Sequence, residues 1–148
     1  MKYSNPFSYS DPLQSKMVNC LMHDGKKSIA QRILTDTFDE LHRRGHEDPK
    51  QSFEIALQNA TPNMEVKPKR IGGGVYQIPM EVTPKRQQTL SIRWILDGAR
   101  KRKGIPMYKR LALELHDASN DTGYAVQKKE EVHRVAQANR AFAHLARY

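Results

Sequence analysis

The stretch that decides the fold is residues 64–83, MEVKPKRIGGGVYQIPMEVT. Apolar and polar side chains alternate on both sides of the glycines at 72–74, which is the pattern of two β-strands joined by a turn. Prolines at 68, 79 and 84 exclude a central strand. The stretch therefore predicts a two-stranded ribbon with free edges. Because an isolated ribbon is marginally stable in water, we expect a partner to order it.

The sequence on either side of the ribbon has helical periodicity. Helices are predicted at 12–23, 28–43 and 49–60 before the ribbon and at 87–103, 106–120 and 125–144 after it. Asp11 and Asp48 each precede a proline and supply an N-cap carboxylate, and Ser28 offers a third cap. The predicted fold class is mostly α: a six-helix bundle with a protruding two-stranded β-ribbon between helices three and four. We expect a single domain over residues 1–148, with a short non-basic segment at 1–10.

The apolar stripes of these helices predict the core. Cys20 shares its predicted face with Met17 and Leu21, so we interpret it as a small buried hydrophobe and not as a reactive thiol. The other side chains predicted to be buried are Leu13, Ile29, Ile33, Thr37 or Phe38, Leu41, Phe53, Ala56, Leu57, Ala60, Leu90, Ile92, Trp94, Ile95, Leu96, Ala99, Met107, Leu111, Leu115, Ala118, Val132, Val135, Ala136, Asn139, Phe142 and Ala143.

The positive charge is concentrated in the middle of the chain. The 148 residues carry a formal net charge of +9. Residues 66–110 alone hold twelve Lys and Arg side chains against Glu81 and Asp97, a net +10, while the flanking segments are nearly neutral. A basic centre between neutral flanks indicates a surface that binds a polyanion, since unmatched like charges otherwise repel one another.

Two local features within this segment suit a nucleic acid. Arg86, Arg93 and Arg100 recur every seven residues and therefore lie close to one face of the fourth helix, where arginine forks match phosphate oxygens. A pairing of Arg93 with Asp97 is the competing interpretation. In the ribbon, Tyr76 either stacks on a base or packs with its neighbours on the same strand, Ile78 and Met80.

No catalytic or metal-binding constellation can be assembled. A single Cys20 excludes an internal disulfide, and no apolar run approaches the roughly 20 residues that span a bilayer. His42 and His46 are four residues apart without a third ligand, so surface positions are expected for both. His116 beside Asp117, and His133 near Glu130, are interpreted as ordinary surface contacts. The sequence predicts no enzyme, no metal and no cofactor.

Four blocks resemble a known family. The stretches at 19–28 (NCLMHDGKKS), 66–79 (VKPKRIGGGVYQIP), 93–102 (RWILDGARKR) and 128–144 (KKEEVHRVAQANRAFAH) are similar to small-subunit ribosomal protein seven of the bacterial and organellar type, in the family's order. The resemblance implies a structural constituent of the small ribosomal subunit. It would bind the 3′ major domain of the rRNA and nucleate head assembly, with its ribbon near the tRNA exit site and the mRNA path.

The resemblance and the charge pattern together give the expected contacts. The exit-site ribbon would use Arg70, Gly72, Gly73, Gly74 and Tyr76. Head and platform proteins are the expected neighbours, with no membrane and a monomer within the ribosome. The expected rRNA contacts are Lys26, Lys27, Lys67, Lys69, Arg70, Lys85, Arg86, Arg93, Arg100, Lys101, Arg102, Lys103, Lys109, Arg110, Lys128, Lys129, Arg134 and Arg140.

The ends depart from the bacterial pattern. Residues 1–15 contain only Lys2 as a basic side chain, and the chain stops at Leu145-Ala-Arg-Tyr148, whereas bacterial members have a basic arm and a longer tail. These features favour a mitochondrial ribosome, with a plastid or a bacterial cytoplasm as alternatives.

A DNA-binding regulator that uses the fourth and fifth helices as a helix-turn-helix is the alternative function; it would need a dimer.

Overall fold

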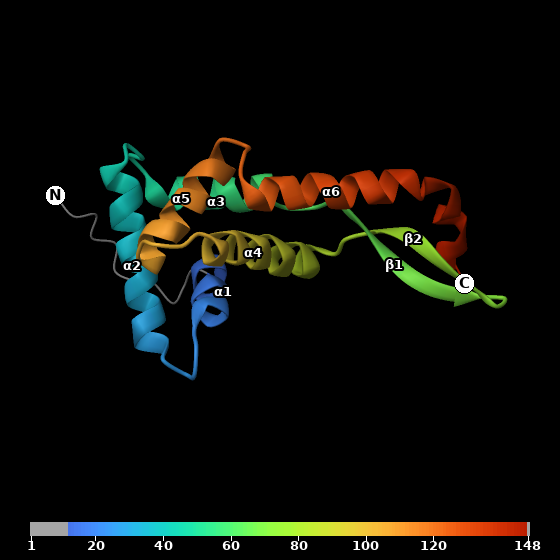
Figure 1. Ribbon diagram of the computed structural model, residues 1–148, viewed down its shortest axis with the longest axis horizontal. Helices are drawn as coiled ribbons and strands as arrows, with labels where there is room; N and C mark the ends of the chain where they lie inside the picture. The colour runs from blue at the N-terminus through green and yellow to red at the C-terminus, as the bar shows by residue number, and fades with distance from the viewer. Residues whose placement is uncertain (1–11, 148) are drawn as a thin grey trace.

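A computed structural model of the protein describes residues 12–147, which form an elongated body with the ribbon at one end (Figure 1). Within these residues, three helices precede the ribbon: α1 (Pro12–Leu21), α2 (Lys27–Arg43) and α3 (Pro49–Asn59). The ribbon consists of β1 (Met64–Ile71) and β2 (Gly74–Glu81). It is followed by α4 (Pro84–Lys101), α5 (Met107–Ser119), α6 (Tyr124–Ala138) and a 3₁₀ helix, η1 (Arg140–Arg147). The predicted fold class, mostly α with a two-stranded ribbon between the third and fourth helices, is confirmed.

The ribbon turns through two residues. β1 and β2 pair antiparallel, from Met64 opposite Glu81 to Ile71 opposite Gly74. Gly72 and Gly73 have φ values of 54° and 86°, as a two-residue hairpin turn of the I′ type requires at both central positions. Gly74, the third glycine of the predicted tip, belongs to β2.

The ribbon is covered by the C-terminal part of the same chain. α6 packs against β1, and η1 packs against β2 (Figure 1). Ile78 of β2 is only 1% exposed as a result. The partner that the sequence led us to expect for the ribbon therefore includes the protein's own last two helices.

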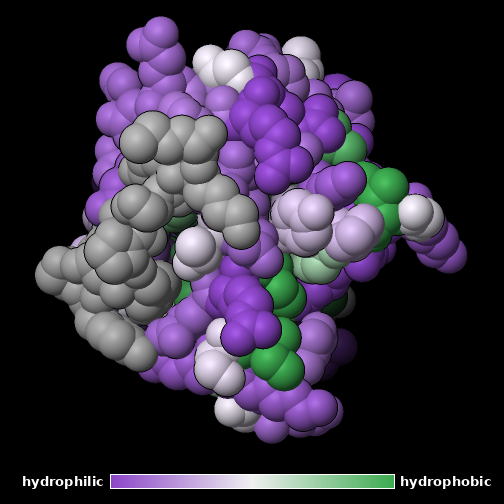
Figure 2. Space-filling model, turned by 90° about the vertical axis from the view of Figure 1, so that its left-hand side faces the viewer, coloured by the Kyte–Doolittle hydropathy of each residue, from purple (hydrophilic) through white to green (hydrophobic). Residues whose placement is uncertain are grey.

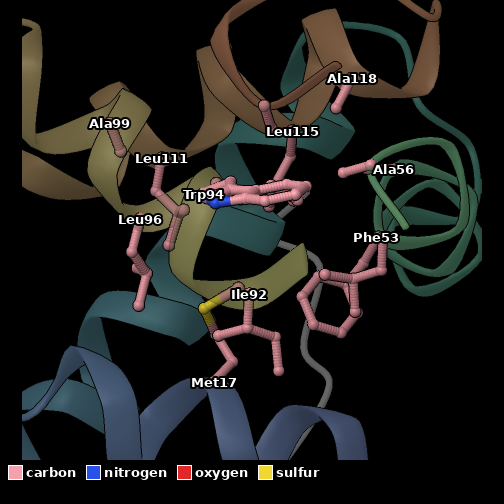
Figure 3. Close-up of a cluster of buried hydrophobic side chains, with 14 of the residues drawn as sticks. Met17, Phe53, Ala56, Ile92, Trp94, Leu96, Ala99, Leu111, Leu115 and Ala118 are labelled. Atoms are coloured by element: carbon pink, nitrogen blue, oxygen red, sulfur yellow. The ribbon is translucent and has the colours of Figure 1, made fainter. Parts of the chain in front are cut away.

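The core lies where α4 crosses the other helices. Trp94 of α4 lies among side chains of α3 and α5, including Ala56 and Leu115 (Figure 3). Ile92, on the same helix, lies near Met17 of α1 and is fully buried. Most of the predicted core is confirmed, and α4 is buried on one face and exposed at its arginines.

Cap residues explain where most helices begin. The Asp48 carboxylate accepts a hydrogen bond from the Gln51 amide at 3.3 Å and starts α3, as predicted. α4 begins at Pro84 and not at residue 87, because the Thr83 hydroxyl accepts from the Arg86 amide at 3.4 Å and repeats the same cap-proline pattern. The Ser28 cap is wrong, since α2 already begins at Lys27 without a side-chain cap. Asp11 lies outside the described residues.

The last predicted helix is broken. α6 ends at Ala138, and the chain continues as a 3₁₀ helix instead of an α-helix to residue 144. Asn139 sits at the break, where its side-chain amide donates to the Val135 carbonyl at 2.9 Å. An asparagine that bonds its local backbone in this way competes with the helix. The predicted stripe is correspondingly shallow: Ala136 is buried, Val135 is 39% exposed, and Ala143 is exposed.

Two further predicted core residues, one on α1 and one on α2, are exposed. α1 ends at Leu21, before the predicted residue 23, and buries Gln14, Met17, Val18 and Leu21. At 100° per residue, Cys20 lies roughly 110° from the centre of that stripe, which explains its exposure.

The second is Ile29 on α2. It is 52% exposed because the buried stripe of that helix begins one residue later, at Ala30. Thr37 can belong to that stripe because its hydroxyl donates to the Ile33 carbonyl at 2.7 Å.

The surface is largely polar. In the view of Figure 2, hydrophilic side chains cover most of the end that carries α2, and hydrophobic ones show only as separate patches. None of the helices within residues 12–147 is long and apolar enough to cross a membrane.

Candidate nucleic-acid interface

The arginine stripe of α4 faces outward. Arg86, Arg93 and Arg100 are all exposed, and the opposite face of the helix is buried. Arg86 Nε lies 3.7 Å from Glu65 Oε2 of β1, and Arg100 Nη2 donates to the Cys20 carbonyl at 3.1 Å. Among the described residues, no carboxylate lies within ion-pairing distance of Arg93, so the alternative pairing with Asp97 is not formed. Within residues 12–147, the Arg93 side chain is therefore exposed and has no ion-pair partner.

The bond from Arg100 joins the ends of two helices. It holds the C-terminal end of α1 against the last turn of α4. The connection that follows α1 carries Lys26 and Lys27, both exposed at the start of α2. The first basic block of the sequence and the C-terminal part of the arginine stripe therefore lie at the same end of the body.

Lys101 and Arg102, at the C-terminal end of α4, contact side chains of α6 and α5. α4 ends at Lys101, two residues before the predicted end at 103, and Arg102 follows it in an extended conformation. Its Nη2 donates to Asp117 Oδ2 at 2.6 Å and to Glu114 Oε2 at 3.2 Å, so its charge is balanced internally. Lys101 Nζ lies 4.2 Å from the centre of the Tyr124 ring. Arg102 has a structural role that the basic run at 100–103 does not reveal.

The ribbon presents its basic residues on both faces. Lys69 is opposite Tyr76, and Arg70 is opposite the exposed Val75, on the other face of the pair. Lys67 Nζ lies 4.0 Å from Glu65 Oε1. The flanking turn exposes the backbone of Gly72 and Gly73.

Tyr76 contacts a ring from outside the ribbon. Its ring centre lies 5.4 Å from that of Phe142 in η1, with the planes tilted by 53°. The sequence offered two interpretations of Tyr76, base stacking or packing with its strand neighbours. Neither includes this contact, because Phe142 was expected on a continuous helix.

The last helices add a second basic region. Lys128, Lys129 and Arg134 lie on α6, where Lys128 Nζ is 3.9 Å from Glu131 Oε2. Arg140 of η1 lines a cavity of about 360 Å³ beside the ribbon, together with His133.

Lys85 is exposed at the start of α4, Lys103 follows that helix, and Lys109 and Arg110 lie half-buried on α5. The predicted contacts therefore fall into a ribbon–α6 region and a region at the C-terminal end of α4.

The sequence missed a histidine pair. His46 Nε2 lies 2.8 Å from His116 Nδ1, and His46 Nδ1 lies 2.8 Å from the Ser52 hydroxyl. Both histidines are half-buried, so the surface positions predicted for them are wrong. Burial, and then the charge of His116, lower the pKa of His46. Within residues 12–147, no group of three potential ligands is placed to hold a metal ion.

His133 is also in a contact between elements. Its Nε2 accepts a hydrogen bond from the Asn63 amide at 3.0 Å, which ties α6 to the segment that enters β1. Burial, and then the charge of Lys129, lower the pKa of His133. The bond requires a neutral imidazole nitrogen. His133 therefore positions the ribbon, and no carboxylate among the described residues pairs with it.

The sequence is similar to known proteins along nearly its whole length. The family model of ribosomal protein S7p/S5e matches residues 2–140. The small ribosomal subunit protein uS7 of Dictyoglomus turgidum is 50% identical over 136 residues, which cover 92% of this chain and 87% of that protein. The uS7 proteins of Clostridium tetani and Pseudothermotoga lettingae are 52% and 48% identical, over 92% and 93% of this chain and 87% and 88% of their own lengths.

Proposed function

Because the chain belongs to the ribosomal protein S7p/S5e family, we propose that it binds the 3′ major domain of the small-subunit rRNA and starts assembly of the subunit head. Its role as a component of the small ribosomal subunit is structural and not enzymatic. Nothing in the family supports the alternative of a DNA-binding regulator.

The observation that supports the rRNA contact is the exposed arginine stripe of α4. Phosphate oxygens are the natural partners of Arg93, which has no carboxylate neighbour among the described residues, and of Arg86 and Arg100, which keep unused donors. The remaining predicted contacts extend this surface. Arg102 is the exception, since its side chain is held by Glu114 and Asp117.

The ribbon carries the second part of the proposal. Its tip at Gly72 and Gly73 lies at the far end of the body from α2 (Figure 1). We expect Arg70, the glycine turn and the exposed face near Val75 to reach the exit-site tRNA and the mRNA path. Deleting residues 71–74 should spare rRNA affinity and alter tRNA release from the exit site. A loss of rRNA affinity on that deletion would overturn this division of labour.

The proposal also covers the compartment of the ribosome and the ribosomal proteins that contact the chain. The relatives described above are bacterial, and a mitochondrial ribosome stays a prediction. Co-sedimentation of the chain with small subunits from mitochondria, plastids or bacteria decides between the three. Cross-linking within the same particles identifies the head and platform proteins that it contacts.

The rRNA contact is tested by the salt dependence of binding. Affinity for the isolated 3′ major domain is measured between low and physiological salt for the wild type and for Arg93→Ala and Arg100→Ala. Each lost phosphate contact should lower the slope of log affinity against log salt by roughly 0.7–1.

Arg43→Ala is the matched control for this experiment. It removes an arginine that is 65% exposed and already paired with Glu40 at 3.3 Å. The control should keep the wild-type slope. Unchanged slopes and affinities in both α4 variants would overturn the proposal.

A further inference from the structure

A cavity of about 440 Å³ lies where four helices meet. The end of α1, the middle of α2, the last turn of α4 and the first turn of α5 contribute its walls. Six residues line it: Leu21, His23, Ile33, Arg100, Met107 and Arg110. The volume falls within the range of small-molecule sites and exceeds what a lone phosphate ion needs.

All the polar side chains that line this cavity are basic. Arg110 Nη1 donates to the Arg102 carbonyl at 3.1 Å, and Arg100 Nη2 donates to the Cys20 carbonyl at 3.1 Å. Each arginine is thus held by one terminal nitrogen, and its orientation is fixed before any ligand arrives. The exposed His23 completes the basic wall.

Arg110 has a buried donor that no other described residue satisfies. Its Nε is buried and has no hydrogen-bond partner. A buried donor without an acceptor is costly, and a cationic one more so. Because this Nε is itself buried, a ligand in the cavity would meet the guanidinium through its second terminal nitrogen, and the forked group suits phosphate oxygens.

The rest of the wall is apolar. Leu21 is buried, and Ile33 and Met107 are half-buried at the edge of the core. Aliphatic side chains of this kind accommodate the face of a nucleobase or a ribose. A cavity with cations on one side and an apolar wall on the other matches a nucleotide, because the phosphate is an anion and the base has an apolar face.

We propose that this cavity holds one nucleotide of the small-subunit rRNA, turned out of its stack, with its phosphate on Arg100 and Arg110 and its base against Ile33 and Met107. The proposal rests on the proposed function, since it assumes that the chain binds rRNA. It assigns a role to His23, Ile33 and Met107, none of which was among the predicted contacts. Lys26, Lys27 and Lys103 lie on the flanking segments, where they can hold the adjoining phosphates.

The first experiment probes the cavity without rRNA. The methyl signals of Met107 and Ile33 are followed by NMR in the full chain as adenosine monophosphate or inorganic phosphate is added. Adenosine monophosphate should shift both signals in a saturable way, and inorganic phosphate should compete with it more weakly. Arg110→Gln should abolish the shifts, whereas Lys50→Gln, which removes a cation from α3, should keep them.

The second experiment fills the cavity without changing its charge. Met107→Trp should lower affinity for the 3′ major domain at least tenfold and reduce the salt slope by about one, as one lost phosphate contact requires. Ile55→Trp is the matched control, because Ile55 is 37% exposed on α3 and away from the cavity. Thermal unfolding of both variants verifies that they are folded, and Arg110→Gln provides an independent variant.

The outcomes separate this proposal from the proposed function. If the wild type binds the 3′ major domain while Met107→Trp and Arg110→Gln bind it equally well, the cavity proposal is wrong and rRNA binding stands. If adenosine monophosphate binds but rRNA affinity is unchanged in the variants, the cavity takes free nucleotides and the rRNA assignment is overturned. If the wild type does not bind the 3′ major domain at all, the proposed function fails first.

Discussion

The Nε2 atom of His46 lies 2.8 Å from the Nδ1 atom of His116, although 70 positions separate the two residues in the chain. Their ring centres are 5.0 Å apart and the rings are nearly perpendicular, at 88°. His46 lies in the α2–α3 connection and His116 in the last turn of α5. One of the two facing nitrogens must be unprotonated for the bond to form, so the contact requires at least one neutral histidine.

This pair makes stability depend on pH. The folded protein lowers the pKa of His46 below 6.5, through burial and then the charge of His116. The unfolded chain therefore binds the proton first as the pH falls, and the free energy of unfolding decreases from about pH 6.5 downward. The loss on breaking the pair should be about 1 kcal/mol, the net value of one hydrogen bond. Urea unfolding at pH 7.5 and 5.5 measures it.

Variants assign this pH dependence to its source. His46→Gln should reduce the fall in unfolding free energy between the two pH values. His133→Gln should do the same, because burial and Lys129 lower the pKa of His133 as well. His144→Gln, an exposed site in η1, should keep the full fall. An identical fall in all three variants would show that other groups are responsible.

A buried carboxylate joins three helices at the opposite side of α5. Glu114 is 1% exposed, and its two oxygens accept from the Ala125 amide of α6 at 3.2 Å and from Arg102 after α4 at 3.2 Å. Glu114→Ala should cost about 3 kcal/mol, near the lower end for breaking a buried ion pair, because Arg102 stays one-third exposed to water. The midpoint of urea unfolding measures this loss.

Gly98 leaves the room that Glu114 needs. A Cβ at position 98 would lie 2.7 Å from the Glu114 carboxyl carbon, so Gly98→Ala should cost about 1–3 kcal/mol by overpacking. The two effects should not add, since removing the Glu114 carboxyl group also removes the two closest contacts and leaves only the Tyr124 Cβ at 3.0 Å. The Gly98→Ala/Glu114→Ala double variant should therefore be more stable than the sum of the single losses predicts. Strict additivity would contradict the proposed contact.

Arg93 and Arg102 should behave in opposite ways although both lie in the basic centre. Arg93→Gln should lower the salt slope of rRNA binding by roughly 0.7–1 and leave the free energy of unfolding within about 0.5 kcal/mol of the wild type. Arg102→Gln should mainly reduce stability, by about 1–2 kcal/mol, because it breaks charged hydrogen bonds to Glu114 and Asp117. Equal slopes and equal stabilities would contradict this division.

The sequence predicted the features that depend on local chemistry. The ribbon follows from alternation around the glycines, the start of α3 from Asp48 before a proline, and the outward stripe of α4 from its seven-residue spacing. The same cap-proline logic applied to Thr83 would have placed the start of α4 correctly.

What the sequence did not predict depends on contacts between distant segments. The His46–His116 pair and the internal role of Arg102 need α5 to be placed against the α2–α3 connection and the end of α4. Cys20 and Ile29 were misassigned because each helix buries a stripe rotated from the one that apolar residues alone suggest. The stripe of α1 is correctly placed once Gln14 counts as buried, and that of α2 once it starts at Ala30 instead of Ile29.

The contact between Tyr76 and Phe142 should order the ribbon. An isolated hairpin is marginally stable, and an aromatic pair adds about 0.5–1.5 kcal/mol beyond the area that it buries. Phe142→Ala should therefore reduce hydrogen-exchange protection of the β1 and β2 amides by about tenfold or more, because local opening becomes easier. The amides of α4 and α5 should keep their protection, since neither helix depends on η1.

The control separates the ring contact from the presence of η1. Ala146→Gly changes a half-buried residue of the same 3₁₀ helix without touching the Tyr76 ring contact, and it should leave the ribbon amides protected. Affinity of Phe142→Ala for the 3′ major domain should stay within about twofold of the wild type, because the arginine stripe of α4 is unaffected. Unchanged ribbon protection in Phe142→Ala would mean that the ring contact with Tyr76 does not order β1 and β2.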